Sequence, residues 1–292
     1  MFTCSLCPHR CRAVRDEAVG GGRCALPAVA HVARAALHFG EEPCISGTRG
    51  SGTVFFGGCT LTCAFCQNRE ISRGAAGRPV TAERLAEIFR ELCDAGAHNI
   101  NLVSPTPYVP VIREALRRYR PPVPVVYNSS GYERVETLRA LDGLVDVYLP
   151  DYKYASGTLS AELSGAADYP TVAQAAIAEM RRQTGPVQLD GDGLIRRGTV
   201  VRHLVLPGHT NDSLRVLDTL ATLPRGTYVS LMFQYTPMAE IAGHPELSRR
   251  LTARECDKVW QHMLEVGLTE GYVQSRDAAG VAMIPCFDGT GV

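Results

Sequence analysis

The chain has 292 residues, 45% of them hydrophobic, and its 30 basic and 30 acidic residues cancel. This composition suits one large α/β domain or two smaller ones and argues against disorder, and the zero net charge removes the general reason to expect nucleic acid or an anionic membrane as partner. No run approaches the roughly 20 apolar residues of a membrane span, and the first residues show no apolar signal core, so we expect a cytoplasmic protein. Eleven cysteines in such a chain indicate metal-binding thiolates rather than a disulfide framework.

The first fifty residues differ in character from the rest. They hold a Gly-Gly-Gly run at 20–22, little periodicity except around 28–37, and an N-terminal cysteine quartet, Cys4, Cys7, Cys11 and Cys24. Four soft ligands in a segment too short to build a core predict a structural metal. Zinc and a second 4Fe–4S cluster both suit four thiolates, and the spacing of the first pair slightly favours zinc. We expect residues 1–50 to form a small cysteine-rich lobe, with four unliganded thiols as the alternative.

From residue 51 onward, short apolar runs alternate with amphipathic stretches, the pattern of repeated strand–helix units and a parallel sheet. Strands are expected at 53–57, 99–103, 123–127, 145–149, 200–206 and 227–233. Helices are expected at 82–95, 109–119, 133–141, 171–183, 213–223 and 253–266, with Thr81 and Thr252 as N-caps. These six units predict an α/β domain over residues 51–267, and residues 268–292 form a C-terminal extension without a clear pattern.

The loop after the first expected strand holds three cysteines within eight residues, in "FFGGCTLTCAFCQN". A tetrahedral zinc site or a closed iron–sulfur cluster wants four protein ligands, so Cys59, Cys63 and Cys66 are one ligand short. If the three thiolates bind three irons of a 4Fe–4S cube, the fourth iron can chelate an exogenous ligand. The alternative is a zinc site or a redox thiol pair that a distant residue completes.

The spacing C-x3-C-x2-C resembles the signature of the radical S-adenosylmethionine (SAM) superfamily. Residues 56–68, "YNSSGY" at 127–132, "VDVYLPDYKY" at 145–154 and "VRHLVLPGHTND" at 201–212 are similar to segments of pyruvate formate-lyase activating enzymes. The whole chain resembles an activase-like branch that has "CSLCPHRC" near the N-terminus and "EEPCISG" ahead of the cluster loop. The resemblance implies a partial (β/α)6 radical SAM barrel, with its active site at the C-terminal edge of the strands.

The resemblance also assigns roles to residues at the strand ends. The three cysteines of the loop match the cluster ligands, and Phe65 matches the aromatic position near the adenine, with simple core packing as the alternative. The family's Gly-Gly-Glu stretch, which meets the amine of SAM, is replaced here by Ser104, Pro105 and Thr106. Hydroxyl or carbonyl oxygens of these residues could still accept hydrogen bonds from that amine.

Polar residues follow the third and fourth expected strands. Asn128, Ser129 and Ser130 could hydrogen-bond the ribose or the carboxylate of SAM, although these residue types also form ordinary turns. Asp151 and Lys153 match the Asp-x-Lys element of the activases, with a solvated surface pair as the alternative. Lys153 is one of only two lysines among thirty basic residues, which suggests that an ammonium is needed there, facing the SAM carboxylate.

The fifth expected strand contains Arg202 and His203, one of which points inward. A histidine inside a strand is more often a satisfied core residue than a catalytic one. Arg202 is therefore the candidate for cofactor binding at this position.

As the resemblance implies, a reduced 4Fe–4S cluster passes one electron to the sulfonium of SAM, and the resulting 5'-deoxyadenosyl radical abstracts a hydrogen atom from the substrate. We expect an electron donor such as flavodoxin or ferredoxin, and a glycyl radical enzyme whose glycine is activated. Direct radical modification of a peptide or a small-molecule metabolite is the alternative. A third reading is a metal-stabilised binding module that needs no SAM.

Overall fold

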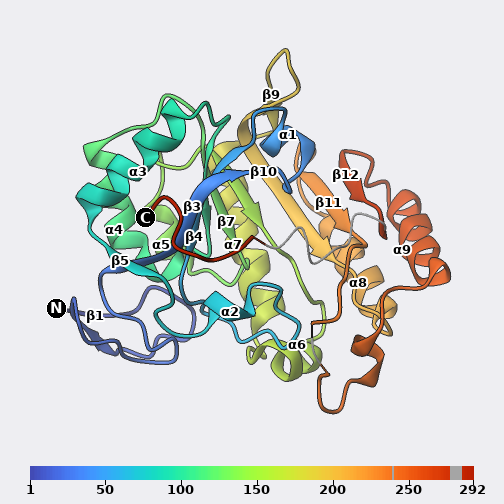
Figure 1. Ribbon diagram of the computed structural model, residues 1–292. Coiled ribbons are helices and arrows are strands. Elements are labelled where there is room, and N and C mark those ends of the chain that lie inside the picture. Colours follow the sequence, from blue (N-terminus) through green and yellow to red (C-terminus); the bar gives the residue numbers. More distant parts are fainter. Residues whose placement is uncertain (239, 277–284) are drawn as a thin grey trace.

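Figure 1 shows the computed structural model, which describes residues 1–238, 240–276 and 285–292. Seven parallel strands form the body of one curved sheet. In spatial order they are β4 (Ser51–Phe56), β6 (Ile100–Val103), β7 (Val125–Ser129), β8 (Val147–Pro150), β10 (Ile195–Leu204), β11 (Tyr228–Met232) and β12 (Gly271–Gln274). Every residue of β4, β6, β7 and β8 is buried, as expected for strands covered on both faces.

Helices connect the parallel strands and cover the outer face of the sheet (Figure 1). They are α3 (Ala82–Asp94), α4 (Val109–Arg118), α5 (Val135–Arg139), α6 (Gly157–Ser164), α7 (Tyr169–Thr184), α8 (Thr210–Leu220) and α9 (Ala253–Glu265). Thr81 caps α3 by accepting a hydrogen bond from the Arg84 N–H (3.2 Å). Thr252 caps α9 in a capping box with Glu255. Both predicted caps are present, and the architecture is the expected α/β partial barrel.

All six predicted strand–helix units are present, with shifted boundaries. The largest shift at a strand start is in β10, which begins at Ile195, five residues earlier than expected, and pairs there with β9 (Gln188–Leu189). The sequence did not predict β12, which lies parallel to β11 within the stretch 268–292. Residues 277–284 of that stretch lie outside the described part of the chain.

The other edge of the sheet is antiparallel. β3 (Ala30–His38) pairs with β4 and carries β5 (Arg78–Val80) on its far side. It falls within the residues that the sequence assigned to the N-terminal lobe, yet it belongs to the main sheet. Ahead of it, β1 (Phe2–Thr3) and β2 (Val14–Arg15) form a separate pair. The end of the chain returns along β3, where the Gly289 N–H donates to the Ala33 carbonyl (3.0 Å).

A short helix plugs the barrel interior at the N-terminal ends of the strands. α1 (Pro43–Ser46), which begins with a proline, buries Cys44 and Ile45 against apolar residues of β7, β8 and β10. The remaining short elements are α2 (Arg69–Ser72), η1 (Thr106–Tyr108) and η2 (Pro245–Ser248). Within the described ranges, no helix has the length and apolar character that a membrane crossing requires.

Candidate active site

The loop that follows β4 carries three cysteines to the C-terminal edge of the parallel strands. Gly57 and Gly58 begin this loop, and both positions disfavour a side chain. A Cβ at Gly57 would lie 2.0 Å from a backbone carbonyl oxygen, and Gly58 has a φ of +82°. Beyond them, Cys59, Cys63 and Cys66 line one cavity of about 310 Å³.

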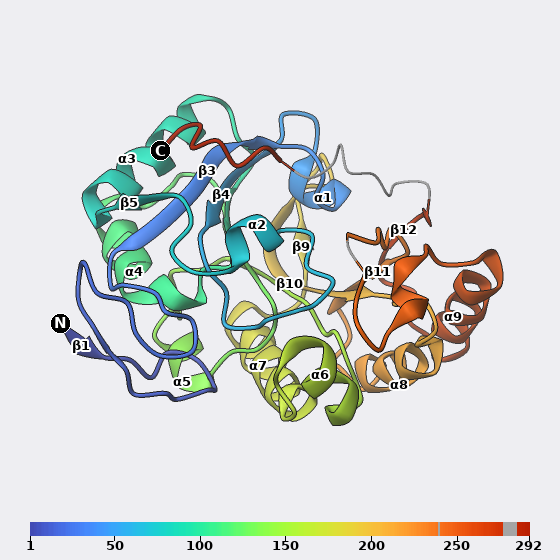
Figure 2. The same cartoon turned by 60° about the horizontal axis from the view of Figure 1, so that its bottom comes forward.

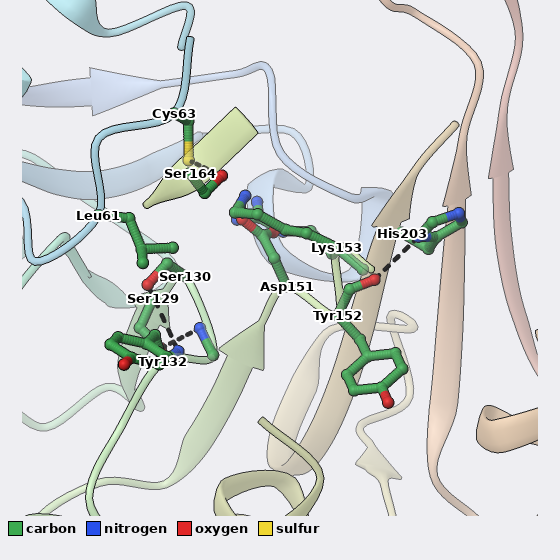
Figure 3. A network of polar contacts seen from close by, with 12 residues as sticks. Leu61, Cys63, Ser129, Ser130, Tyr132, Asp151, Tyr152, Lys153, Ser164 and His203 are labelled. Atoms are coloured by element: carbon green, nitrogen blue, oxygen red, sulfur yellow. Dashed lines mark hydrogen bonds and ion pairs between the residues drawn. The ribbon is translucent and has the colours of Figure 1, made fainter. Parts of the chain in front are cut away.

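The end of α6 holds this loop in place. The buried Ser164 donates a hydrogen bond to Cys63 Sγ (3.0 Å), a contact visible in Figure 3. The Ala64 N–H donates to the Leu163 carbonyl (2.8 Å). These contacts join two segments that are about a hundred residues apart in sequence, so the cysteine loop depends on the docking of α6.

The thiols of this loop fit a soft metal site. Burial, with a smaller contribution from Cys63, raises the pKa of Cys59 to about 12. Burial also raises the pKa of Cys63, although Lys153 and Ser164 oppose it. A bound metal reverses such shifts, because a coordinated sulfur is held as the thiolate. Three free sulfur donors around one cavity are therefore suited to an iron–sulfur cluster with three protein ligands.

Charged side chains from the ends of β8 and β10 line the same cavity. Lys153 Nζ lies 2.5 Å from Asp151 Oδ2, and Arg202 Nε lies 3.0 Å from Asp151 Oδ1. Burial opposes ionisation of Asp151, but the two cations outweigh it and hold its pKa below the ordinary value. Burial likewise opposes the charge of Lys153, but Asp151 outweighs it and the pKa of the ammonium is raised. Both groups are therefore charged at neutral pH.

Arg202 is the centre of this network. Its Nη1 lies 3.1 Å from Glu41 Oε2, and its Nη2 donates to Asn128 Oδ1 (2.6 Å). Asn128 and Asn101 each donate to Glu41 Oε1 (3.0 Å). Sequence reasoning did not select Glu41, which reaches the cavity because α1 plugs the barrel directly after it. The pair of glutamates in "EEPCISG", directly ahead of an apolar turn, was the sequence signal that could have pointed to Glu41.

The other polar candidates divide into two groups. Ser104, Ser129 and Ser130 line the cavity, and Ser104 has a φ of +59° just after β6. Thr106 does not line it, because its hydroxyl donates to Glu133 Oε1 (2.6 Å) and both side chains are buried. The structure thus does not bring Thr106 to the site. The N-terminal cysteine quartet also lies outside this cavity.

Phe65 and His203 face different surroundings. Phe65 lines the cavity and packs against Tyr154 and Tyr235, each with its ring centroid 6.4 Å away. His203 projects away from Asp151 and Lys153 (Figure 3), and its Nδ1 lies 2.8 Å from the Tyr152 carbonyl oxygen. Burial lowers the pKa of His203 to about 4, so the imidazole is neutral and belongs to the core.

Comparison with known proteins finds related sequences. The family model described as the radical SAM superfamily matches residues 53–221. An uncharacterized protein of Methanocaldococcus jannaschii, MJ0674, is 30% identical over 265 residues, which cover 87% of this chain and 72% of that protein.

Solved structures with a similar fold include Streptococcus suis SuiB bound to SAM, with a TM-score of 0.50 and 13% identity over 75% of this chain. The aligned part is 48% of the SuiB chain, so this protein spans about half the length of SuiB. SuiB bound to the precursor peptide SuiA gives the same TM-score and identity, over 75% of this chain and 46% of that one. A domain of pyruvate-formate lyase-activating enzyme from Bacteroides vulgatus gives a TM-score of 0.37, at 13% identity over 66% of this chain and 91% of that domain. At this identity, the SuiB comparisons bear on the fold alone.

Proposed function

We propose that this chain, which belongs to the radical SAM superfamily, holds a 4Fe–4S cluster on Cys59, Cys63 and Cys66 and binds SAM beside it. When bound, the two groups supply reductive cleavage of a SAM carbon–sulfur bond and a 5'-deoxyadenosyl radical that abstracts a hydrogen atom. The observation that carries this proposal is the meeting of three free thiols and a network of opposite charges in one cavity at the C-terminal edge of the sheet.

The charged network suits the two ends of an amino acid. The methionyl part of SAM carries a carboxylate and an ammonium, and the cavity offers the cations of Lys153 and Arg202 and the carboxylates of Asp151 and Glu41. We assign the SAM carboxylate to Lys153, because its ammonium has three donors and uses one of them on Asp151. The Arg202 guanidinium already donates to three oxygen atoms of the network.

Glu41 takes the place of the missing Gly-Gly-Glu stretch as the acceptor of the SAM ammonium. Its carboxylate accepts hydrogen bonds from Arg202, Asn101 and Asn128. A carboxylate has about four lone-pair sites, so one acceptor position remains for a further N–H donor. The three donors fix the carboxylate before a ligand arrives, which reduces the cost of ordering it on binding.

Apolar side chains form part of the same cavity and limit the access of water. Phe55, Phe65, Leu204 and Met232 line it, from the cluster loop and from strands on both sides. Exclusion of water protects a reactive intermediate from side reactions and strengthens the electrostatic contacts inside the site. This wall therefore favours hydrogen abstraction from a bound substrate over reaction with solvent.

The substrate that we propose is a backbone glycine of a glycyl radical enzyme, with a donor such as flavodoxin or ferredoxin supplying the electron. The support is the similarity to pyruvate formate-lyase activating enzymes, because the similar segments 127–132 and 145–154 include residues of the cavity wall. The second candidate is direct modification of a peptide or small molecule. SuiB, which has a similar fold, has been solved with a precursor peptide bound.

The test uses the full-length protein, reconstituted and reduced under anaerobic conditions, with SAM. Wild type should release 5'-deoxyadenosine, and Cys63→Ala should not. With a co-encoded glycyl radical enzyme, deuterium on the glycine α-carbon should appear in the 5'-deoxyadenosine, and a glycyl radical should appear by electron paramagnetic resonance.

Deuterium transfer from a peptide or metabolite, without any glycyl radical signal, would reject the activase function and support direct modification. A fully loaded cluster that neither binds nor cleaves SAM would reject both and leave the metal-stabilised binding module.

A further inference from the structure

The segment 1–29 precedes β3 and is the part of the predicted lobe that lies outside the main sheet; it is called the lobe from here on. It has almost no apolar core of its own. Its strands β1 and β2 are two residues long, and the segment buries only Cys4, Arg15, Leu26 and Pro27. Two of these four side chains are a thiol and a guanidinium. A fold below about 40 residues that stands alone usually needs a disulfide or a metal, and all four cysteines of this segment are free.

The backbone is strained at three positions next to cysteines of the quartet. Among the described residues, four non-glycine residues have a positive φ, and three of them, Arg10, Arg12 and Ala25, adjoin Cys11 or Cys24. Such conformations persist only where the surroundings over-determine them, and they gather at functional sites. The lobe must therefore contain an interaction strong enough to hold these turns.

Backbone N–H groups face three of the four sulfurs. The N–H groups of His9, Ala13 and Leu26 each lie near the cysteine sulfur two positions earlier. The Leu61 N–H stands in the same relation to Cys59 in the cluster loop, at 3.5 Å. A thiolate accepts N–H hydrogen bonds more strongly than a thiol, and they surround the sulfurs of metal centres. The quartet thus shares a local geometry with the cluster loop.

Arg15 is a buried cation without a carboxylate partner in the described structure. The side chain is 1% exposed, and its guanidinium donates to the carbonyl oxygens of Pro107 (2.9 Å) and Pro27. Its Nη1 also donates to Cys4 Sγ (3.5 Å), and its Nε has no hydrogen-bond partner among the residues that the structure describes. A guanidinium keeps its charge when buried. The rings of Phe2 and Tyr108, 5.4 and 5.9 Å away, and two carbonyl oxygens stabilise it in part, and an opposite charge nearby would stabilise it further. The quartet sulfur that this guanidinium contacts is Cys4 Sγ.

We propose that Cys4, Cys7, Cys11 and Cys24 hold a tetrathiolate metal centre, a zinc ion or a 4Fe–4S cluster, and that Arg15 is its buried counter-charge. Four thiolates outweigh the positive charge of either metal core, so the centre is anionic. This explains why the lobe buries a guanidinium, strains three turns and lacks a core. It does not depend on the proposed function of the Cys59 site.

The lobe lies beside the active-site loop, so its metal bears on that loop. His9 Nε2 lies 2.9 Å from the Thr60 carbonyl oxygen in the cluster loop. Arg23 donates to the Gly165 carbonyl (2.9 Å), directly after the end of α6. Figure 2 shows the lobe, in dark blue, next to α5. A metal that orders the lobe therefore also supports the position of the loop that carries Cys59.

Sulfur spacing alone does not choose the metal. In the described structure no three sulfurs of the quartet lie within 4.8 Å of one another. Sulfurs on one tetrahedral zinc, bound at about 2.3 Å, are roughly 3.8 Å apart, so zinc would draw them together. In a cube each thiolate binds its own iron and the sulfurs stay further apart. The ligand atoms of His209, His244 and Glu246 do lie within 4.8 Å of one another, so metal analysis must separate these residues from the quartet.

Metal and sulfide analysis of the anaerobically purified full-length protein tests the proposal. Wild type should hold one zinc besides the irons of the Cys59 site, or about twice the iron and sulfide of one 4Fe–4S cluster. Cys7→Ser/Cys24→Ser should lose the extra metal and keep most of the iron of the Cys59 site. Cys63→Ala should lose the iron of the Cys59 site and keep the extra metal, and His244→Ala should keep both. Wild type with one cluster and no further stoichiometric metal overturns the proposal, as does loss of the extra metal in His244→Ala.

Variants of Arg15 test the counter-charge without removing a ligand, and they decide the case if the cysteine variants do not fold. Loss of a group around a metal site weakens binding by about 10–100-fold. Arg15→Met should therefore lower the affinity for the extra metal by that factor in competition with a chelator, and Arg15→Lys, which keeps the charge, should restore most of it. Equal affinity in wild type and Arg15→Met overturns the assignment of Arg15.

Discussion

Arg202→Met is expected to destabilise the cluster-free chain strongly, because it leaves buried carboxylates without their cation. The Arg202 side chain is 15% exposed and binds Glu41 at 3.1 Å and Asp151 at 3.0 Å, whose side chains are 11% and 16% exposed. Removing one partner of a buried ion pair costs about 3–5 kcal/mol. Lys153 still neutralises Asp151, and two amides still bind Glu41, so we expect the lower end, about 3 kcal/mol.

Arg196→Met is the matched control on the same strand. Arg196 pairs with Asp190 at 2.8 Å, but its side chain is 53% exposed, and exposed pairs contribute about 0–1 kcal/mol. Urea denaturation of both variants and wild type, under anaerobic reducing conditions, gives the two losses in the free energy of unfolding. Arg202→Met combined with Glu41→Gln should recover part of the loss, because it removes a stranded charge. Losses below about 1 kcal/mol in both single variants would refute the reasoning, because the network would then behave as a solvated one.

Three further changes probe the cofactor site. Lys153→Gln should keep the cluster and raise the Kd for SAM about 10–150-fold in equilibrium dialysis, from the loss of a charged hydrogen bond of about 1.5–3 kcal/mol; an unchanged Kd rejects the assigned role. Cys63→Ala should abolish the oxygen-sensitive 4Fe–4S signal in Mössbauer spectra, whereas Cys93→Ala, a change outside the cavity, should keep it. An intact signal in Cys63→Ala would refute the assignment of Cys63 as a cluster ligand. Gly58→Ala should lower cluster retention more than Gly74→Ala. Both glycines have a positive φ, but a Cβ at Gly58 would lie 2.6 Å from a side chain, whereas a Cβ at Gly74 would meet nothing within 4 Å. Equal iron contents of the two variants after gel filtration would contradict this.

The strands could be predicted where burial is two-sided. β4, β6, β7 and β8 read as nearly unbroken apolar runs because helices and the barrel interior cover both faces. β12 escaped prediction because it is a four-residue strand at the sheet edge, and its sequence Gly-Tyr-Val-Gln is only partly buried. The division into segments 1–50, 51–267 and 268–292 stays a prediction, although β3 links the first segment to the main sheet.

The candidate site could be predicted where residues directly follow a strand, and not where tertiary contacts decide. Asp151 and Lys153 follow β8, so a parallel sheet brings them to its C-terminal edge. Glu41 is 161 residues from Arg202 in sequence, and its contact depends on the plug that α1 forms, so the paired glutamates of "EEPCISG" did not identify its partner. Thr106 follows a strand, as expected for a site residue, but it does not reach the cavity. A buried carboxyl group accepts a hydrogen bond from its hydroxyl.

That carboxyl group, Glu133, predicts a specific pH dependence of stability. It is 2% exposed, and accepts hydrogen bonds from the Thr106 hydroxyl (2.6 Å) and the Tyr127 hydroxyl (3.3 Å). Burial raises its pKa from 4.5 to about 7, although these hydroxyls oppose the shift. The folded chain thus keeps a proton that the unfolded chain releases above pH 4.5. The contribution of protonated Glu133 to the free energy of unfolding is complete below pH 4.5 and is lost as the pH rises to about 7.

The size of this loss follows from the shift. The pKa rises by about 2.5 units, from 4.5 to about 7, and at 1.36 kcal/mol per unit this gives a loss of about 3 kcal/mol between pH 4.5 and 7. Glu133→Gln removes the titration, so its free energy of unfolding relative to wild type should rise by that amount across the same window in urea denaturation. Glu136→Gln, which removes a carboxylate whose side chain is 61% exposed, should show no such rise. A difference between Glu133→Gln and wild type that stays constant from pH 4.5 to 8 would mean that the folded chain does not raise the pKa of Glu133, which would refute the reasoning.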